Sequence, residues 1–214
     1  MKIKGAIFDL DGTLLDSMAL WDQLGEEYLR RGGYIPLRNT AQVLRTMTLE
    51  QAASYLRQTY KMAKSPEEII GELLQLIAEN YRCHIPLKPG VQPLLAQLKE
   101  RQVKMCIATA TDHDLAQAAL ARLDVLHYFD FIVTCSQLRM GKDDPQFFGQ
   151  VLERLGTPLG ETVVFEDALH AVAGAKAAGL FVVAVYDISA HEDRAALQAT
   201  ADLYLNSFTD WRWI

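Results

Sequence analysis

The feature that most constrains this chain is a short apolar run near its start that ends in two acidic residues. Ala6, Ile7 and Phe8 form the run, and Asp9 and Asp11 follow it, separated by one residue. A run this short and apolar predicts a strand that is buried on both faces of a sheet. The strand therefore carries two carboxylates at its carboxyl end, which is the edge where open α/β folds bind their ligands.

Two carboxylates this close repel each other, so one must hold a proton or a cation must lie between them. Ligands that offer only oxygen suit Mg²⁺, which binds one or two carboxylates together with water and a substrate phosphate. An alternative is that D-x-D-G marks only a turn or a calcium loop. The chain lacks the acids that a calcium loop needs at later positions, which argues against that alternative.

The composition predicts a globular protein with one or two domains, because half of the 214 residues are hydrophobic. The net charge of −6 argues against a nucleic-acid partner. We expect neither a signal peptide nor a membrane span, since no apolar run is long enough to cross a bilayer. The cysteines Cys83, Cys106 and Cys135 form no C-x-x-C pair. We therefore expect reduced thiols in a cytoplasmic protein, with Cys106 in the core.

Residues 16–87 are predicted to form an inserted helical domain of roughly four helices. Apolar residues recur at helical spacing from residue 18 to residue 31, where Gly32 and Gly33 end the helix. T-L-E-Q from Thr48 has the pattern of a capping box, and Ser65 precedes a proline and two acids, which is another helix start. Residues 1–15 and 88–214 would then form the core, and the two chain crossings would act as hinges.

Strands alternate with helices in the remaining sequence. Strands are expected at 103–108, 131–134, 161–165, 181–185 and 201–205, which predicts a Rossmann-like parallel sheet with helices on both faces.

Polar residues follow three of these strands. Thr109 ends the second strand, where it could bind phosphate oxygens or only cap a helix. Lys142 precedes a helix, where it could neutralise a phosphate and a carboxylate together or be a solvated surface lysine. Glu166 and Asp167 end the fourth strand, where they could complete a divalent cation site or cap a helix.

These stretches together resemble the four motifs of the haloacid dehalogenase-like hydrolases. They are DLDGTLLD from residue 9, Thr109, GKDDPQFF from residue 141, and FEDALHAVAGAKAAGL from residue 165. The best resemblance is to the phosphoglycolate phosphatase and β-phosphoglucomutase group, which implies that residues 16–87 are a helical cap that closes over the site. The chain departs from the usual motifs at Asp143, Gln146 and Ala168.

The resemblance also implies a role for each site residue. Asp9 would be the nucleophile that takes the phosphoryl group, and Asp11 the general acid and base. Thr109, the backbone of Ala110 and Lys142 would stabilise the phosphoryl oxygens, and Gly12 would allow the tight turn beside them. The ligands of Mg²⁺ would be Asp9, the backbone carbonyl of Asp11, Asp167 and, as a second or outer ligand, Glu166.

We therefore predict a Mg²⁺-dependent phosphatase that acts on a small phosphorylated metabolite, as a monomer or weak homodimer with no nucleic-acid or membrane partner. An acid at Asp11 favours phosphate esters over halides, because a halide leaving group needs no proton. One alternative is a β-phosphoglucomutase-like mutase, although Leu49 stands where its cap arginine is expected and Arg45 lies nearby. A non-catalytic binding module is a further alternative, but it would be expected to lack one of four charged residues that are all present: Asp9, Asp11, Lys142 and Asp167.

Overall fold

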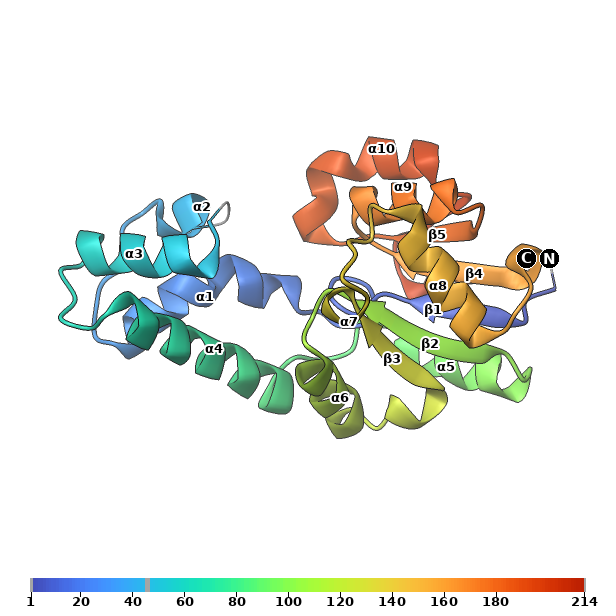
Figure 1. The fold of residues 1–214 in the computed structure, drawn as a ribbon, viewed down its shortest axis with the longest axis horizontal. Helices are drawn as coiled ribbons and strands as arrows, with labels where there is room; N and C mark the ends of the chain where they lie inside the picture. The colour runs from blue at the N-terminus through green and yellow to red at the C-terminus, as the bar shows by residue number, and fades with distance from the viewer. Residues whose placement is uncertain (1, 45–46, 214) are drawn as a thin grey trace. The chain divides into compact units, whose positions relative to one another are not determined.

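The computed structural model describes residues 2–44 and 47–213. The chain divides into two compact units (Figure 1): a core unit of residues 1–17 and 85–214, and a helical unit of residues 18–84. The first boundary follows Ser17 instead of the predicted residue 15. The second precedes Ile85 instead of residue 88.

The core unit is built on one six-stranded parallel sheet. Its strands are β1 (Gly5–Phe8), β2 (Lys104–Thr109), β3 (Phe131–Thr134), β4 (Thr162–Glu166), β5 (Phe181–Val185) and β6 (Leu203–Leu205). Their order is β3-β2-β1-β4-β5-β6, so that β1 pairs with both β2 and β4. The order of strands reverses between β1 and β4, which is where doubly wound sheets bind ligands. The predicted Rossmann-like α/β fold is confirmed.

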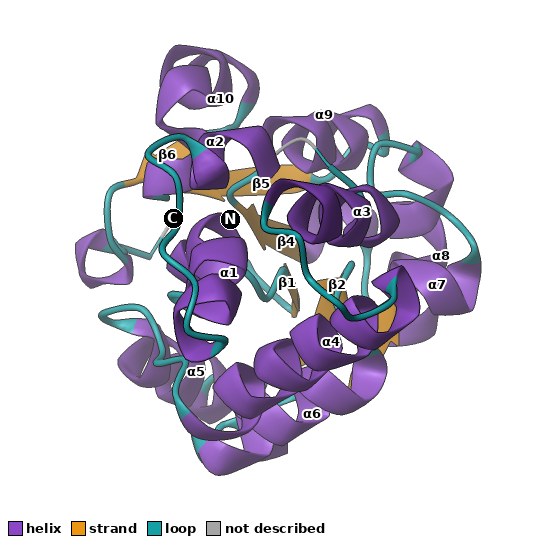
Figure 2. Ribbon diagram, turned by 90° about the vertical axis from the view of Figure 1, so that its left-hand side faces the viewer, coloured by secondary structure: helices purple, strands orange, loops and turns teal. Residues whose placement is uncertain are grey.

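Helices cover both faces of this sheet (Figures 1 and 2). On one face lie α5 (Val91–Glu100) and α6 (His113–Arg122). On the other lie α8 (Pro145–Leu155), α9 (Leu169–Ala177) and α10 (Arg194–Thr200), which bury side chains such as Phe147 and Val172 against Ile7 and Val164. Shorter helical segments connect these elements: α7 (Cys135–Leu138), η1 (Leu126–Tyr128), η2 (Leu159–Glu161), η3 (Ile188–Asp193) and η4 (Phe208–Asp210).

Aromatic side chains fill part of the core beneath β1 and β4. Phe8 stacks on Phe165 with ring centroids 4.6 Å apart. Phe208 and Trp211, from the C-terminal segment, pack against the Phe165 ring at 5.8 and 5.4 Å. Trp211 is therefore part of the buried core.

The helical unit contains α1 (Met18–Arg31), α2 (Thr40–Leu44), α3 (Leu49–Thr59) and α4 (Pro66–Cys83). The predicted helix starts at Thr48 and Ser65 are confirmed, because each forms a complete capping box with the residue three positions later. Buried Leu24, Leu56 and Leu73 contribute to the core of this unit. Arg45, which bears on the mutase alternative, lies outside the described residues.

Two expectations from composition can be compared with the structure. Within the described part of the chain, none of the helices combines the length and the apolar character that a membrane crossing requires. Cys83, Cys106 and Cys135 are free thiols, and Cys106 is fully buried as predicted.

Candidate active site

The site lies at the carboxyl ends of the three central strands. Asp9 directly follows β1, Thr109 is the last residue of β2, and Glu166 is the last residue of β4. The backbone N–H of Asp9 donates to the Phe165 carbonyl at 2.9 Å, which continues the pairing of β1 with β4. Because parallel strands all point the same way, residues far apart in the sequence meet at this edge.

Three buried carboxylates form the centre of the site. Asp9, Glu166 and Asp167 each offer an oxygen, and these oxygens lie within 4.8 Å of one another. The side chain of Asp11 is directed elsewhere: its Oδ1 accepts the Ser17 hydroxyl at 2.7 Å and its Oδ2 accepts the Thr111 hydroxyl at 2.5 Å.

Lys142 reaches this cluster from the loop before α8. Its Nζ donates to Asp9 Oδ1 and, at 3.1 Å, to Glu166 Oε2. The side chain is only 6% exposed, which excludes the alternative of a solvated surface lysine. The Lys142 ammonium group therefore bridges two carboxylates: Asp9, which follows β1, and Glu166, which ends β4.

The cluster holds more negative than positive charge. Burial first, and the neighbouring charge of Asp9 second, raise the pKa of Asp167 to about 7 and the pKa of Glu166 well above its ordinary range. Burial alone would lower the pKa of Lys142, but the Asp9 and Glu166 carboxylates outweigh it and raise that pKa. A divalent cation would offset the excess charge, and a donor set made only of oxygens fits Mg²⁺.

The turn after β1 is built against Asp167. Gly12 has a φ of +79°, and a Cβ there would lie 2.3 Å from Asp167 Oδ2, so no other residue fits without displacement. The next residue, Thr13, is buried and donates its hydroxyl to Asp167 Oδ1 at 3.0 Å. No role was predicted for Thr13, because its partner is 154 residues away and no pattern of neighbouring residues indicates that contact.

Two threonines lie at the end of β2. Thr109 is buried, and its Oγ1 accepts the backbone N–H of Thr111 at 3.0 Å. The N-cap of α6 is Asp112, so the helix-cap alternative for Thr109 is wrong. Ala110, between the threonines, is exposed. Thr111 was missed, because nothing in the local sequence indicates that its hydroxyl meets Asp11.

The capping alternative for Glu166 and Asp167 holds only in part. The N-cap of α9 is Ala168, which offers no side-chain acceptor. Glu166 Oε1 accepts the Ala168 N–H in a long bond of 3.4 Å, while its Oε2 binds Lys142. Asp167 accepts Thr13 instead of a backbone N–H of α9.

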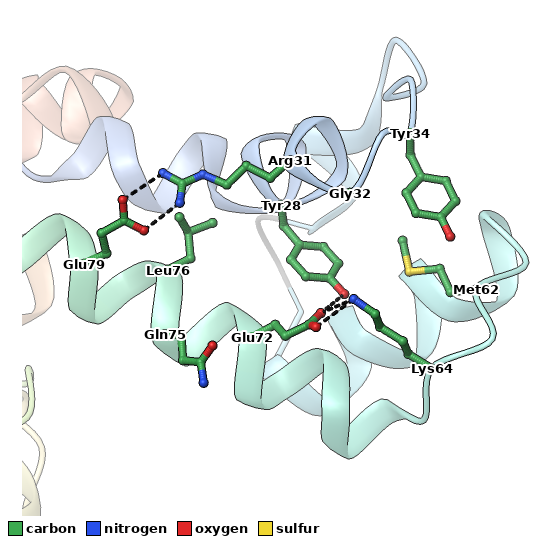
Figure 3. Close-up of a pocket in the computed structure, with 10 residues that line it drawn as sticks. All are labelled: Tyr28, Arg31, Gly32, Tyr34, Met62, Lys64, Glu72, Gln75, Leu76 and Glu79. Atoms are coloured by element: carbon green, nitrogen blue, oxygen red, sulfur yellow. Dashed lines mark hydrogen bonds and ion pairs between the residues drawn. The ribbon is translucent and has the colours of Figure 1, made fainter.

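The helical unit has a pocket of its own, of about 360 Å³, between α1 and α4 (Figure 3). Tyr28 Oη donates to Glu72 at 2.7 Å, and Lys64 Nζ lies 2.7 Å from both oxygens of the same carboxylate. Arg31 binds Glu79 at 2.6 Å. Carboxylates therefore neutralise the cations that line this pocket, and none of the predicted site residues belongs to it.

A doubly wound sheet with a buried Asp–Glu–Asp–Lys cluster at its carboxyl edge defines an α/β enzyme with a site suited to phosphate chemistry. The model of the haloacid dehalogenase-like hydrolase family matches residues 6–185, and the chain belongs to this family. The predicted resemblance is confirmed.

Individual relatives match nearly the whole chain. It is 30% identical over 212 residues to validoxylamine A 7'-phosphate phosphatase of Streptomyces hygroscopicus subsp. limoneus, covering 98% of this chain and 96% of the relative. It is 31% identical over 211 residues to a phosphorylated carbohydrates phosphatase of Thermotoga maritima, and the match covers 93% of this chain and 92% of the relative. A crystal structure from Thermotoga maritima, provisionally assigned as a β-phosphoglucomutase, superposes with a TM-score of 0.82 at 28% identity. The superposition covers 96% of this chain and 95% of that chain.

Proposed function

We propose that this hydrolase is a phosphatase that releases phosphate from a small phosphorylated sugar. The observation that carries the proposal is the buried cluster in which Lys142 bridges Asp9 and Glu166 beside Asp167. The two relatives described above support it, since their names describe phosphatases, one of them for phosphorylated carbohydrates. A mutase is not favoured, because Leu49 occupies the position at which a cap arginine is expected.

Asp9 would act as the nucleophile. Its carboxylate oxygen attacks phosphorus, the bond from phosphorus to the sugar oxygen breaks, and an aspartyl-phosphate forms. Lys142, which donates a hydrogen bond to this carboxylate, would offset the charge on the phosphoryl oxygens, and the Thr109 hydroxyl and the Ala110 backbone would also bind these oxygens. Water then attacks phosphorus, which releases phosphate and restores Asp9.

Asp11 would carry the proton in both steps. In the first it protonates the sugar oxygen as that group leaves, and in the second it accepts a proton from the attacking water. The Ser17 and Thr111 hydroxyls, which donate to its two oxygens, support this assignment because they orient the carboxylate.

The carboxylates of Asp9, Asp167 and Glu166 and the backbone carbonyl of Asp11 would hold Mg²⁺. The bound ion supplies positive charge that offsets the charge of the carboxylates and the phosphate. Thr13 and Gly12 keep Asp167 in place for this role, through a hydroxyl donor and a close backbone approach.

The test is phosphate release from a panel of sugar phosphates, phosphoglycolate and nucleoside monophosphates, with Mg²⁺ or with EDTA. We expect metal-dependent turnover that favours sugar phosphates and is lost in Asp9→Asn. Asp124→Asn is the matched control, because that carboxyl is 92% exposed. A folded wild type that releases no phosphate, or full activity in Asp9→Asn, would contradict the proposal. Isomerisation that requires a sugar bisphosphate would indicate the mutase instead.

A further inference from the structure

The two segments that join the core to the helical unit are paired within the core unit. Leu15 forms an antiparallel bridge with Leu87. Two backbone hydrogen bonds flank the bridge, from the Asp16 N–H to the Pro86 carbonyl at 3.0 Å and from the Lys88 N–H to the Leu14 carbonyl at 2.8 Å. Backbone pairing with residues 86–88 therefore holds residues 14–16 in position.

Residues 14–17 in turn hold the turn that carries Asp11. The Leu15 carbonyl accepts the N–H of Gly12 at 3.0 Å, and the Leu15 N–H donates to the Leu10 carbonyl at 2.8 Å. Ser17 donates its hydroxyl to Asp11 Oδ1 at 2.7 Å. A shift of residues 14–17 would therefore move the Asp11 carboxylate.

An ion pair between the half-buried Lys88 and the buried Asp187 anchors residues 86–88. Lys88 Nζ lies 2.7 Å from Asp187 Oδ2 and donates to the Tyr186 carbonyl at 2.8 Å. The two side chains are 11% and 3% exposed. Asp187 Oδ1 also accepts the backbone N–H and the hydroxyl of Ser189 at 2.9 and 2.7 Å. Because Asp187 lies just beyond β5, the pair ties residues 86–88 to the carboxyl edge of the sheet.

We propose that Lys88 and Asp187 are positioning residues that place Asp11 through the paired segments 86–88 and 14–17. This inference rests on the proposed function, since it assigns to the pair an effect on the group that protonates the leaving oxygen. A buried pair is weak evidence of a purely stabilising role, because apolar side chains of similar size often replace such pairs without loss of stability. Lys88 connects its own segment, residues 86–88, to two others. Its backbone N–H donates to Leu14, and its side chain binds Tyr186 and Asp187.

The leaving group provides the decisive measurement. p-Nitrophenyl phosphate releases a phenolate that needs little protonation, whereas a sugar phosphate releases an alkoxide that depends on the general acid. We expect Lys88→Met and Asp187→Asn to lower kcat/KM at least about tenfold more for the sugar phosphate than for p-nitrophenyl phosphate, since a general acid contributes about 10²- to 10⁴-fold. Lys176→Met is the control, because Lys176 pairs with Asp202 at a partly exposed site.

A third variant separates positioning from stability. Lys88→Met combined with Asp187→Leu removes both charges, so no uncompensated buried charge remains. We expect this double variant to recover stability relative to the single variants but to keep the selective loss on the sugar phosphate. Equal losses on the two substrates in folded variants would overturn the inference.

Failure of the proposed function would be recognised separately, because the wild type would then release no phosphate from either substrate. In that case amide hydrogen exchange tests the anchoring directly. We expect the Asp16 and Lys88 N–H groups to exchange at least about tenfold faster in Asp187→Asn than in Lys176→Met, since local opening sets their protection. Unchanged exchange of these two N–H groups would overturn the inference. If Lys88→Met does not fold, the kinetic comparison is made with Asp187→Asn.

Discussion

At the scale of the residue, Asp167 shows how burial changes a common carboxyl group. Burial first and the charge of Asp9 second raise its pKa to about 7, while the unfolded chain releases this proton near the ordinary value of 3.8. Between about pH 4 and pH 7 the folded, metal-free protein therefore holds a proton that the unfolded chain has lost. Its free energy of unfolding must fall as the pH rises through this window.

The substitution Asp167→Asn removes this titrating group. We expect the decrease in denaturation midpoint between pH 5 and pH 7, measured in EDTA, to be smaller in the variant than in the wild type. Glu166, whose pKa is also raised, should leave part of the decrease in place. Asp124→Asn should behave as the wild type, and an equal decrease in Asp167→Asn would contradict the assignment.

At the scale of the element, α9 supports the loop that delivers Lys142. A Cβ on Gly174 would lie 2.0 Å from the Lys142 carbonyl oxygen and 3.0 Å from its carbonyl carbon. Backbone atoms cannot move aside as the end of a flexible side chain can. The absence of a side chain at this one helical position therefore lets the loop lie against α9 while its lysine reaches Asp9.

Two glycine substitutions test this contact. Gly149 lies in α8, and a Cβ there meets nothing within 4 Å, so Gly149→Ala should raise the free energy of unfolding by about 1 kcal/mol through helix propensity. Gly174→Ala gains the same propensity but must displace the Lys142 backbone, so we expect lower stability and reduced kcat. Urea denaturation and turnover measure both effects, and equal stabilisation by the two variants would show that the loop adapts freely.

At the scale of the whole molecule, the site exists only when distant segments have folded together. Lys142 and Asp9 are 133 residues apart, and Thr13 and Asp167 are 154 apart. A cation that binds this cluster therefore binds the folded protein and not the unfolded chain. Such a ligand stabilises the fold by about 2.7 kcal/mol at a hundred times its dissociation constant.

We expect Mg²⁺ to raise the denaturation midpoint relative to EDTA, and to do so more at pH 8 than at pH 6. The reason is that metal binding requires ionised carboxylates, and the pKa of Asp167 is about 7. Sodium chloride at equal ionic strength controls for screening. A midpoint that does not respond to Mg²⁺ at either pH would contradict the assignment of the cluster as a cation site.

Local sequence patterns were sufficient to predict much of the fold. The six strands could be predicted because each is a short apolar run, and the helix starts at Thr48 and Ser65 because a capping box involves residues only three positions apart. Roughly four helices were predicted for the inserted domain, but no bounds were predicted for its short helix α2, of five residues, and α7, of four residues, was not predicted. A segment that short spans too few turns to show a helical period.

By itself, the sequence determined which polar residue ends each central strand, and therefore which side chains could meet at one edge of the sheet. Tertiary structure alone decided that Thr111 meets Asp11 across 100 residues, that Thr13 supports Asp167, and that Lys88 pairs with the buried Asp187. The physical reason is that these partners are set by the order of the strands and by the burial of both faces of the sheet. No pattern of neighbouring residues encodes such contacts.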